Sequence, residues 1–351
     1  MSGTIGHLTY AVLGAKAAAA RKLPIAPVVG RHFTSYLAGA YLGCDIQTMP
    51  EAVCVDTGRE VGYGTVPIDK SPLTGGAVRP FLLRHGGDEY TPRQVHDLFY
   101  GRAHVVFGFS RAERDLVVPW DHAADYCAAV VDDAFDLFGP GRRPLAYLFG
   151  WMTHIVGDSL IKSIHPGVTL ELLDGKYTPR NRPIQDLVSY HEIGRRELRL
   201  NWDAVLADVA ATPVEPIQFH YMRTAPKRGK LGELFPDGWQ PNRRELLAAV
   251  CAENRRYFGP WSRAESERLQ LRKTGSGWEC DAELSRQTGG LTYAEMLRLA
   301  EQAGFRRALA QIADAVADLF AAVVARTPRL QELPADDGPT WPELIERWNT
   351  R

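Results

Sequence analysis

The sequence predicts an all-α fold, a multi-helix bundle with a long irregular loop, and three observations lead to that prediction. Segments rich in Ala, Leu and Arg recur at helical spacing along most of the 351 residues. Few segments alternate apolar and polar residues with a period of two, which is the pattern of a half-buried strand. Irregular sequence interrupts the helical pattern in two places, at 56–93 and at 225–242.

The predicted helices form two groups along the chain. The first group comprises 6–22, 33–43, 94–107, 122–137, 143–164, 183–200 and 204–211. The second group comprises 242–258, 262–272, 293–304 and 305–326. The most apolar stretch, ADAVADLFAAVVA at 313–325, predicts a helix buried in the core.

The two irregular stretches suggest how the chain is organised. Residues 56–93 are dense in Gly and Pro and predict a long loop, of the kind that often serves as a lid or a binding segment. Residues 225–242 predict a boundary before the second group of helices. We therefore expect one domain over 1–230 and a C-terminal helical extension over 240–351, in which no motif carries chemistry.

The composition is that of an ordinary soluble globular protein and narrows the classes of partner. Basic and acidic residues balance, 41 against 42, and the formal net charge is −1. Since this balance offers no broad positive surface, nucleic acid is an unlikely partner. The 5 cysteines form no CxxC pair, so neither a disulfide framework nor a zinc ribbon is expected. No apolar run approaches the about 18 residues of a membrane span, and no signal-peptide pattern is seen. We expect a cytoplasmic protein without a membrane span.

The stretch GWMTHIVGDSLIKSIHPG, residues 150–167, places three ionisable side chains in an apolar segment. His154 and Asp158 are one helical turn apart and share a face, and Pro166 ends the helix so that His165 lies at its mouth. Burying such groups without a partner is costly, and a metal ion is one candidate partner. His and carboxylate on one helical face are a familiar way to hold zinc, although the same spacing also arises as a plain helix-surface contact.

Further candidate ligands recur near the ends of predicted helices. They are His7 in GHLTYAVLGAK, Asp45 in AYLGCDIQTMP, His96 and His104 in HDLFYGRAH, and His191 with Glu192 in DLVSYHEIGRREL. Each also fits a plain structural role, as a capping Asp, a half-buried His bonded to the backbone or a residue on a solvated helix face. Spacing alone leaves both interpretations open.

Taken together, these residues resemble the zinc-dependent phospholipase C family, whose fold is shared with the single-strand-specific fungal nucleases. The segment LAYLFGWMTHIVGDSLIKSIHPG (145–167) looks like the family's helix with H-x3-D and a further His. GHLTYAV resembles its first helix, where an early His is a ligand, and YLGCDIQ resembles a turn where an Asp is a ligand. The resemblance covers about residues 5–200. It implies a phospholipase C/nuclease-like bundle that holds two or three zinc ions.

The resemblance assigns the catalytic roles to two carboxylates. His154 and Asp158 would hold the central metal pair, with Asp158 bridging the ions. Asp45 would bind zinc and would also orient or deprotonate the attacking water.

The resemblance assigns the remaining ligand positions to histidines. His7 would bind the metal nearest the N-terminus, and His165 and His191 would bind the remaining ion. For the histidine between Asp45 and His154 there are two candidates. We prefer His104 to His96, because its separation from His154 and the aromatic segment after it look closer to the family pattern.

The chain departs from the family pattern at three points. The secreted phospholipases use a mature N-terminal amine as a ligand, whereas this chain begins at Met1. The family's last His is followed four residues later by a Glu, whereas His191 is followed at that spacing by Arg195. Glu192 or Asp186 would have to replace that Glu. The 56–93 loop also looks longer than the family's usual connection.

These expectations define a function to be tested. We expect a zinc-dependent, phospholipase C-like hydrolase that uses metal-activated water to cleave a phosphate ester, a phosphodiester or phosphomonoester, of an intracellular small molecule or lipid. One alternative is a metal-dependent biosynthetic enzyme that acts on a non-phosphate substrate. The other is a helical binding or scaffold protein with a degenerate metal site.

Overall fold

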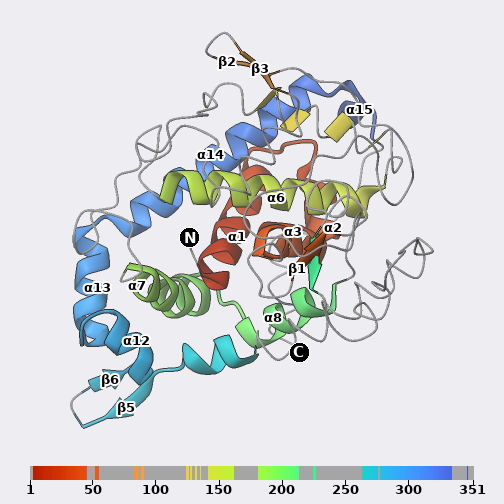
Figure 1. Cartoon of the computed structure of the whole chain (residues 1–351). Helices are drawn as coiled ribbons and strands as arrows, with labels where there is room; N and C mark the ends of the chain where they lie inside the picture. The colour runs from red at the N-terminus through yellow and green to blue at the C-terminus, as the bar shows by residue number, and fades with distance from the viewer. Residues whose placement is uncertain are drawn as a thin grey trace.

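The computed structural model describes most of the helical part of the chain (Figure 1). The described residues are 3–45, 52–54, 83–85, 88–90, parts of 124–135, 141–161, 181–212, 224–226, 263–275, 277–333 and 346. These residues are mostly helical, which confirms the helical character predicted from the sequence.

The helices lie in three stretches of the chain. The first stretch holds α1 (Thr4–Ala20), α2 (Ala26–Arg31) and α3 (Phe33–Asp45). The second holds α6 (Arg142–Ile161), α7 (Asn181–Val188), the π-helix η3 (Ser189–Glu197) and α8 (Trp202–Ala211). The third holds α12 (Ala282–Gln287), α13 (Tyr293–Gln302), α14 (Phe305–Arg326) and α15 (Pro328–Gln331).

Strands occur among the described residues as short antiparallel pairs. The pairs are β1 (Ala52–Cys54) with β4 (Thr224–Pro226), β2 (Leu83–His85) with β3 (Asp88–Tyr90), and β5 (Arg272–Thr274) with β6 (Gly277–Glu279). The 56–93 segment, predicted as a loop, therefore contains a hairpin near its end. The helix predicted over 262–272 is also too long, because the helical residues are 263–268 and β5 begins at Arg272.

The predicted helices that the structure describes are largely confirmed. The 305–326 prediction has the bounds of α14, while α2 and α12 were not predicted, since each spans only 6 residues. The helices predicted at 94–107 and 242–258 lie outside the described residues. The 183–200 prediction is correct as a helix but wrong in type, because its second half is the π-helix η3.

The helices α3 and α6 cross in close contact, and two glycines bring their backbones together. A Cβ on Gly39 would lie 1.9 Å from the carbonyl oxygen of Tyr147, and a Cβ on Gly150 would lie 1.9 Å from that of Tyr36. Neither position accepts a larger residue unless the helices separate. The crossing therefore fixes how α3 and α6 sit against each other.

Tyr36 ties a third helix to this crossing. Its buried hydroxyl donates to the Ala11 carbonyl of α1 at 2.9 Å and lies 2.9 Å from Thr153 Oγ1 of α6. Its ring also makes an edge contact with Phe320 of α14, at 6.3 Å between ring centroids. One side chain thus contacts α1, α6 and α14.

The helix α14 packs along α1 and α6 (Figure 1). Its apolar face, which includes Val316 and Phe320, is buried, and its outer face carries Asp314 and Asp318, which pair with Arg21 at the C-terminal end of α1. By length and composition alone this helix could cross a membrane, but 56% of its apolar window is buried. This burial is that of a core helix and agrees with the expectation of no membrane span. The predicted C-terminal extension shares its core with the N-terminal helices.

We expect Gly39→Ala or Gly150→Ala to destabilise the protein by about 1–3 kcal/mol, because the added methyl group overlaps the backbone of the facing helix. The free energy of unfolding in urea would measure this. Gly275→Ala is a suitable control, because a Cβ there meets no atom within 4 Å. Equal stability of the Gly150 and Gly275 variants would contradict a close crossing.

Candidate functional site

His154 is held in one tautomer by the helix crossing. The residue lies on α6, one turn after Gly150, and is 1% exposed. Its Nδ1 lies 2.9 Å from the carbonyl oxygen of Ala40 on α3. Because a carbonyl oxygen can only accept, Nδ1 must donate, and in the neutral ring the lone pair is then on Nε2. The close approach of the two helices thus sets which nitrogen of His154 can act as a ligand or a base.

His7 brings a second imidazole to the same place. It lies on α1, is 2% exposed, and its ring stacks on that of His154 with centroids 4.1 Å apart and planes 18° apart. The edge of Tyr10 packs near His7 at 5.9 Å. Two residues predicted as metal ligands from distant parts of the sequence are therefore neighbours in the core.

Asp186 of α7 lies against the N-terminus of α1, and this end of α1 is the one that carries His7. Its Oδ1 accepts the backbone N–H of Gly6 at 3.3 Å, and a Cβ on Gly3 would lie 2.0 Å from its Oδ2. The glycine at position 3 therefore makes room for this carboxylate. Burial raises the pKa of Asp186 to about 6, against the opposing effects of Arg182, whose Nε is 3.8 Å from Oδ2, and of the Gly6 N–H. The positive end of the helix dipole also favours the charged form.

Two further polar side chains are buried on the same helical segment as Asp186. Gln185 and Ser189 are one turn apart, and both are at most 1% exposed. Neither the amide of Gln185 nor the hydroxyl of Ser189 forms a hydrogen bond within the described part of the chain. Buried polar groups of this kind usually have a partner, such as an ordered water or an ion.

His191, another predicted ligand, is anchored to the chain at Leu269. Its Nε2 donates to the Leu269 carbonyl at 2.7 Å, and its ring packs against Tyr293 at 5.7 Å between centroids. Burial lowers its pKa, an effect that the nearby Arg195 reinforces and the Leu269 carbonyl opposes. In the neutral ring the lone pair is then on Nδ1.

Glu192, one of the two residues considered as a replacement for the family's Glu, already has partners. Its carboxylate pairs with Arg196 at 3.1 Å and accepts the hydroxyl of Tyr293 at 3.2 Å. Asp186, the other replacement, instead lies against the first turn of α1. The geometry therefore favours Asp186 over Glu192 as a carboxylate near His7.

The other predicted ligands cannot be compared with this arrangement. Asp45 ends α3 and Asp158 lies on α6, but their side chains are outside the described residues, as are His96, His104 and His165. Within the described residues, no group of three or more His, Cys, Asp or Glu could hold a metal ion. Of the predicted ligands that the structure describes, His7 and His154 are thus a stacked pair, and His191 is bonded to Leu269.

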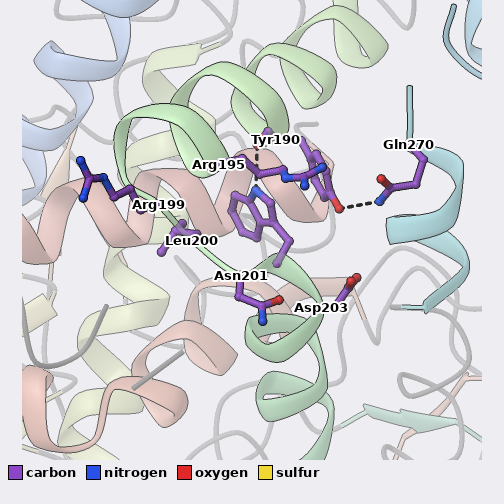
Figure 2. Close-up of a pocket in the computed structure, with 8 residues that line it drawn as sticks. Tyr190, Arg195, Arg199, Leu200, Asn201, Asp203 and Gln270 are labelled. Carbon is purple, nitrogen blue, oxygen red and sulfur yellow. Dashed lines mark hydrogen bonds between the residues drawn. The ribbon is translucent and has the colours of Figure 1, made fainter. Parts of the chain in front are cut away.

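A polar cleft of about 370 Å³, which no sequence motif indicated, lies where η3 ends and α8 begins (Figure 2). Its lining residues come from η3, from the segment that leads into α8 and from the turn near Gln270. They are Tyr190, Arg195, Arg199, Leu200, Asn201, Trp202, Asp203 and Gln270. The lining is mostly polar and charged.

The π-helix shapes one wall of this cleft. A π-helix of 9 residues is unusual, since most are single turns, and such helices are frequent at functional sites. It ends with the N–H of Leu198 donating to the carbonyl of Ile193, five residues back. The same spacing places the guanidinium of Arg195 over the ring of Tyr190, 6.0 Å from its centroid. Arg199, just beyond the helix, has a φ of 55°, a left-handed conformation that is uncommon for arginine.

We expect Asp186→Asn to change how stability depends on pH. A carboxyl whose pKa is about 6 when folded and 3.8 when unfolded favours folding below pH 3.8, and this contribution is lost as the pH rises through 6. The asparagine variant has no carboxyl group at this position and does not lose this contribution. Between pH 4 and 7, its free energy of unfolding should therefore rise relative to that of the parent by roughly 2–3 kcal/mol. Urea titrations with chelator present would measure both curves, and parallel curves would contradict a raised pKa at Asp186.

Comparison of the chain with known protein families, with curated proteins and with solved structures found no match.

Proposed function

We propose that this protein is a zinc-dependent hydrolase that cleaves a phosphate ester by means of metal-activated water. The observation that carries the proposal is the buried pair of His7 and His154, with Nδ1 of His154 donating to the Ala40 carbonyl. Both residues belong to segments that resemble the zinc-dependent phospholipase C family.

The described residues fit a zinc site in their chemistry. Zinc in proteins is bound largely by imidazole nitrogen, carboxylate oxygen and thiolate sulfur. A histidine that binds a metal through one nitrogen commonly donates its other N–H to a carbonyl or carboxylate, which fixes the ring. His154 has this arrangement, with the lone pair of its neutral ring on Nε2. The buried polar groups of Gln185 and Ser189 also fit an interior that holds an ion with its water.

The residues that would hold zinc come from both the described and the remaining parts of the chain. His7 and His154 would be joined by the predicted ligands Asp45, His104, Asp158, His165 and His191. His191 would have to bind through Nδ1, because its Nε2 donates to Leu269. Asp186 is our preferred carboxylate in place of the family's missing Glu.

The chemistry divides between the ion and the protein. Bound zinc would lower the pKa of a water molecule towards neutrality and so supply hydroxide. Asp45 would orient that water or accept its proton. The Ala40 carbonyl keeps the ring of His154 in place, and the glycines at 39 and 150 keep that carbonyl within reach.

The proposed substrate is an intracellular small molecule or lipid with a phosphodiester or phosphomonoester group, and the 56–93 segment would shape access to it. The alternatives are a metal-dependent enzyme for a non-phosphate substrate and a helical binding protein with a degenerate site. Arg195 at the spacing of the family's Glu favours the binding protein. Metal content and an assay panel distinguish the three.

We expect the purified protein to contain two or three zinc equivalents and to hydrolyse bis(p-nitrophenyl) phosphate. The variant with both His154→Ala and Asp158→Ala should lose most of the metal and at least about tenfold in rate, since even residues that only support ligands have effects of this size. Elemental analysis and the rate of p-nitrophenol release measure both. His32→Ala is the matched control, because it removes a histidine that is not a predicted ligand.

A protein without metal, with a double variant that is equally well folded, would contradict the hydrolase proposal and favour the binding protein. Bound zinc with hydrolysis of carboxylic esters but not of phosphate esters would instead favour the non-phosphate enzyme.

A further inference from the structure

We propose that the cleft at the end of η3 binds a small, hydrophilic molecule that carries a carboxylate or phosphate group. None of the predicted metal ligands lines this cleft. The inference is therefore independent of the proposed hydrolase function.

The ion pairs that the structure describes for η3 do not include the arginines that line the cleft. Arg196 of η3 pairs with Glu192, and Glu197 of η3 pairs with Arg306. Arg195 and Arg199, which line the cleft, form no ion pair with any residue that the structure describes. The charged residues of this segment that face away from the cleft are thus paired with one another or with Arg306. The positive charges of Arg195 and Arg199, which line the cleft, are left for a ligand. Arginine is the residue best suited to carboxylate and phosphate, because its guanidinium can donate two parallel hydrogen bonds.

Arg195 rests on a rigid support. Its guanidinium lies over the ring of Tyr190, and that ring stacks on Trp202 with centroids 5.8 Å apart. Trp202 Nε1 donates to the Tyr190 carbonyl, and Gln270 Nε2 donates to the Tyr190 hydroxyl at 2.7 Å (Figure 2). Tyr190 and Trp202 are each 2% exposed. A preorganised arginine loses less entropy when it binds an anion than a freely moving one does.

The cleft also contains an acceptor and a donor, Asp203 and Asn201, that complement Arg195. Asp203 also lines the cleft and forms no ion pair with Arg195, while its Oδ1 accepts the hydroxyl of Ser266 at 2.5 Å. Asn201 uses its side-chain oxygen to cap α8, at 3.2 Å from the Ala204 N–H, so its amide NH₂ is the group that can donate to a ligand. A molecule with an oxyanion for Arg195 and a hydroxyl group for Asp203 would satisfy both.

Size and polarity narrow the ligand further. The volume of about 370 Å³ is near the lower end of the roughly 300–1,000 Å³ of small-molecule sites. Leu200 is the aliphatic member of an otherwise polar and aromatic lining, so an apolar ligand would leave several polar groups unsatisfied. In Figure 2 the guanidinium of Arg199 points away from that of Arg195, and Arg199 therefore adds positive charge at the rim rather than a second clamp. Hydroxy acids and phosphorylated polyols have the required chemistry.

The test is calorimetric titration of the full chain, at fixed ionic strength, with glycerol 3-phosphate, malate, inorganic phosphate and neutral glycerol. We expect saturable binding of glycerol 3-phosphate or malate and none of glycerol. Arg195→Gln should weaken this binding by at least about tenfold, the loss expected for a hydrogen bond to a charged group. Arg286→Gln, which changes an exposed arginine on α12 away from the cleft, should leave it unchanged.

Two results would overturn the proposal. One is the absence of saturable binding of all of these anions to the parent. The other is binding that Arg195→Gln leaves intact, which would place the anion elsewhere, for example at the predicted zinc ions. Arg195 is exposed, so the variant should fold, and its unfolding temperature verifies this. This test measures the binding of anions, whereas the test of the hydrolase proposal measures zinc content and the rate of hydrolysis. Failure of one therefore does not imply failure of the other.

Discussion

The backbone contact between α3 and α6 at Gly39 and Gly150 is the constraint on which the rest of the described structure depends. It brings the Ala40 carbonyl to His154, which fixes the tautomer of that ring. It also places Tyr36 where its hydroxyl reaches α1 and α6, and where its ring meets Phe320 of α14. Because α1 carries His7, the same contact that stabilises the core also sets the distance between the two imidazoles. Stability and the candidate site therefore cannot be altered separately at this crossing.

Sequence patterns predicted the helices whose burial follows a regular period, and they failed where tertiary packing decides the backbone. The 305–326 helix was predicted with its correct bounds because Val316, Phe320 and Val323 recur on one apolar face. The π-helix η3 could not be predicted in this way. Its Gly194 packs directly against the indole of Trp202, so its shape depends on a residue beyond the helix. Short strands such as β5 also carry too few residues for a period to be recognised.

The same distinction applies to the functional residues. His7 and His154 were predicted as ligands, because unusual residue types in apolar helices, together with the resemblance, single them out, and the structure brings them together. Asp186 was identified only as a possible substitute, since its partner is the first turn of α1, which nothing in the sequence around position 186 reveals. Asn201, Asp203 and Gln270 carry no motif at all. Their significance arises only when η3 ends beside α8 and forms the cleft.

The position of Arg195 in η3 bears on whether the proposed metal site is degenerate. In an α-helix, residues four apart share a face, so an arginine four residues after His191 stands where the resemblance places a ligand, which would make the metal site degenerate. Arg195 lies near enough to His191 to help lower its pKa, but its guanidinium lies over the ring of Tyr190, five residues before it in the π-helix. If Asp186 supplies the carboxylate of the proposed metal site, the charge of Arg195 is left for the ligand proposed in the cleft. The two proposed functions would therefore use different residues of one helix, since His191 is directed to the Leu269 carbonyl and Arg195 lines the cleft.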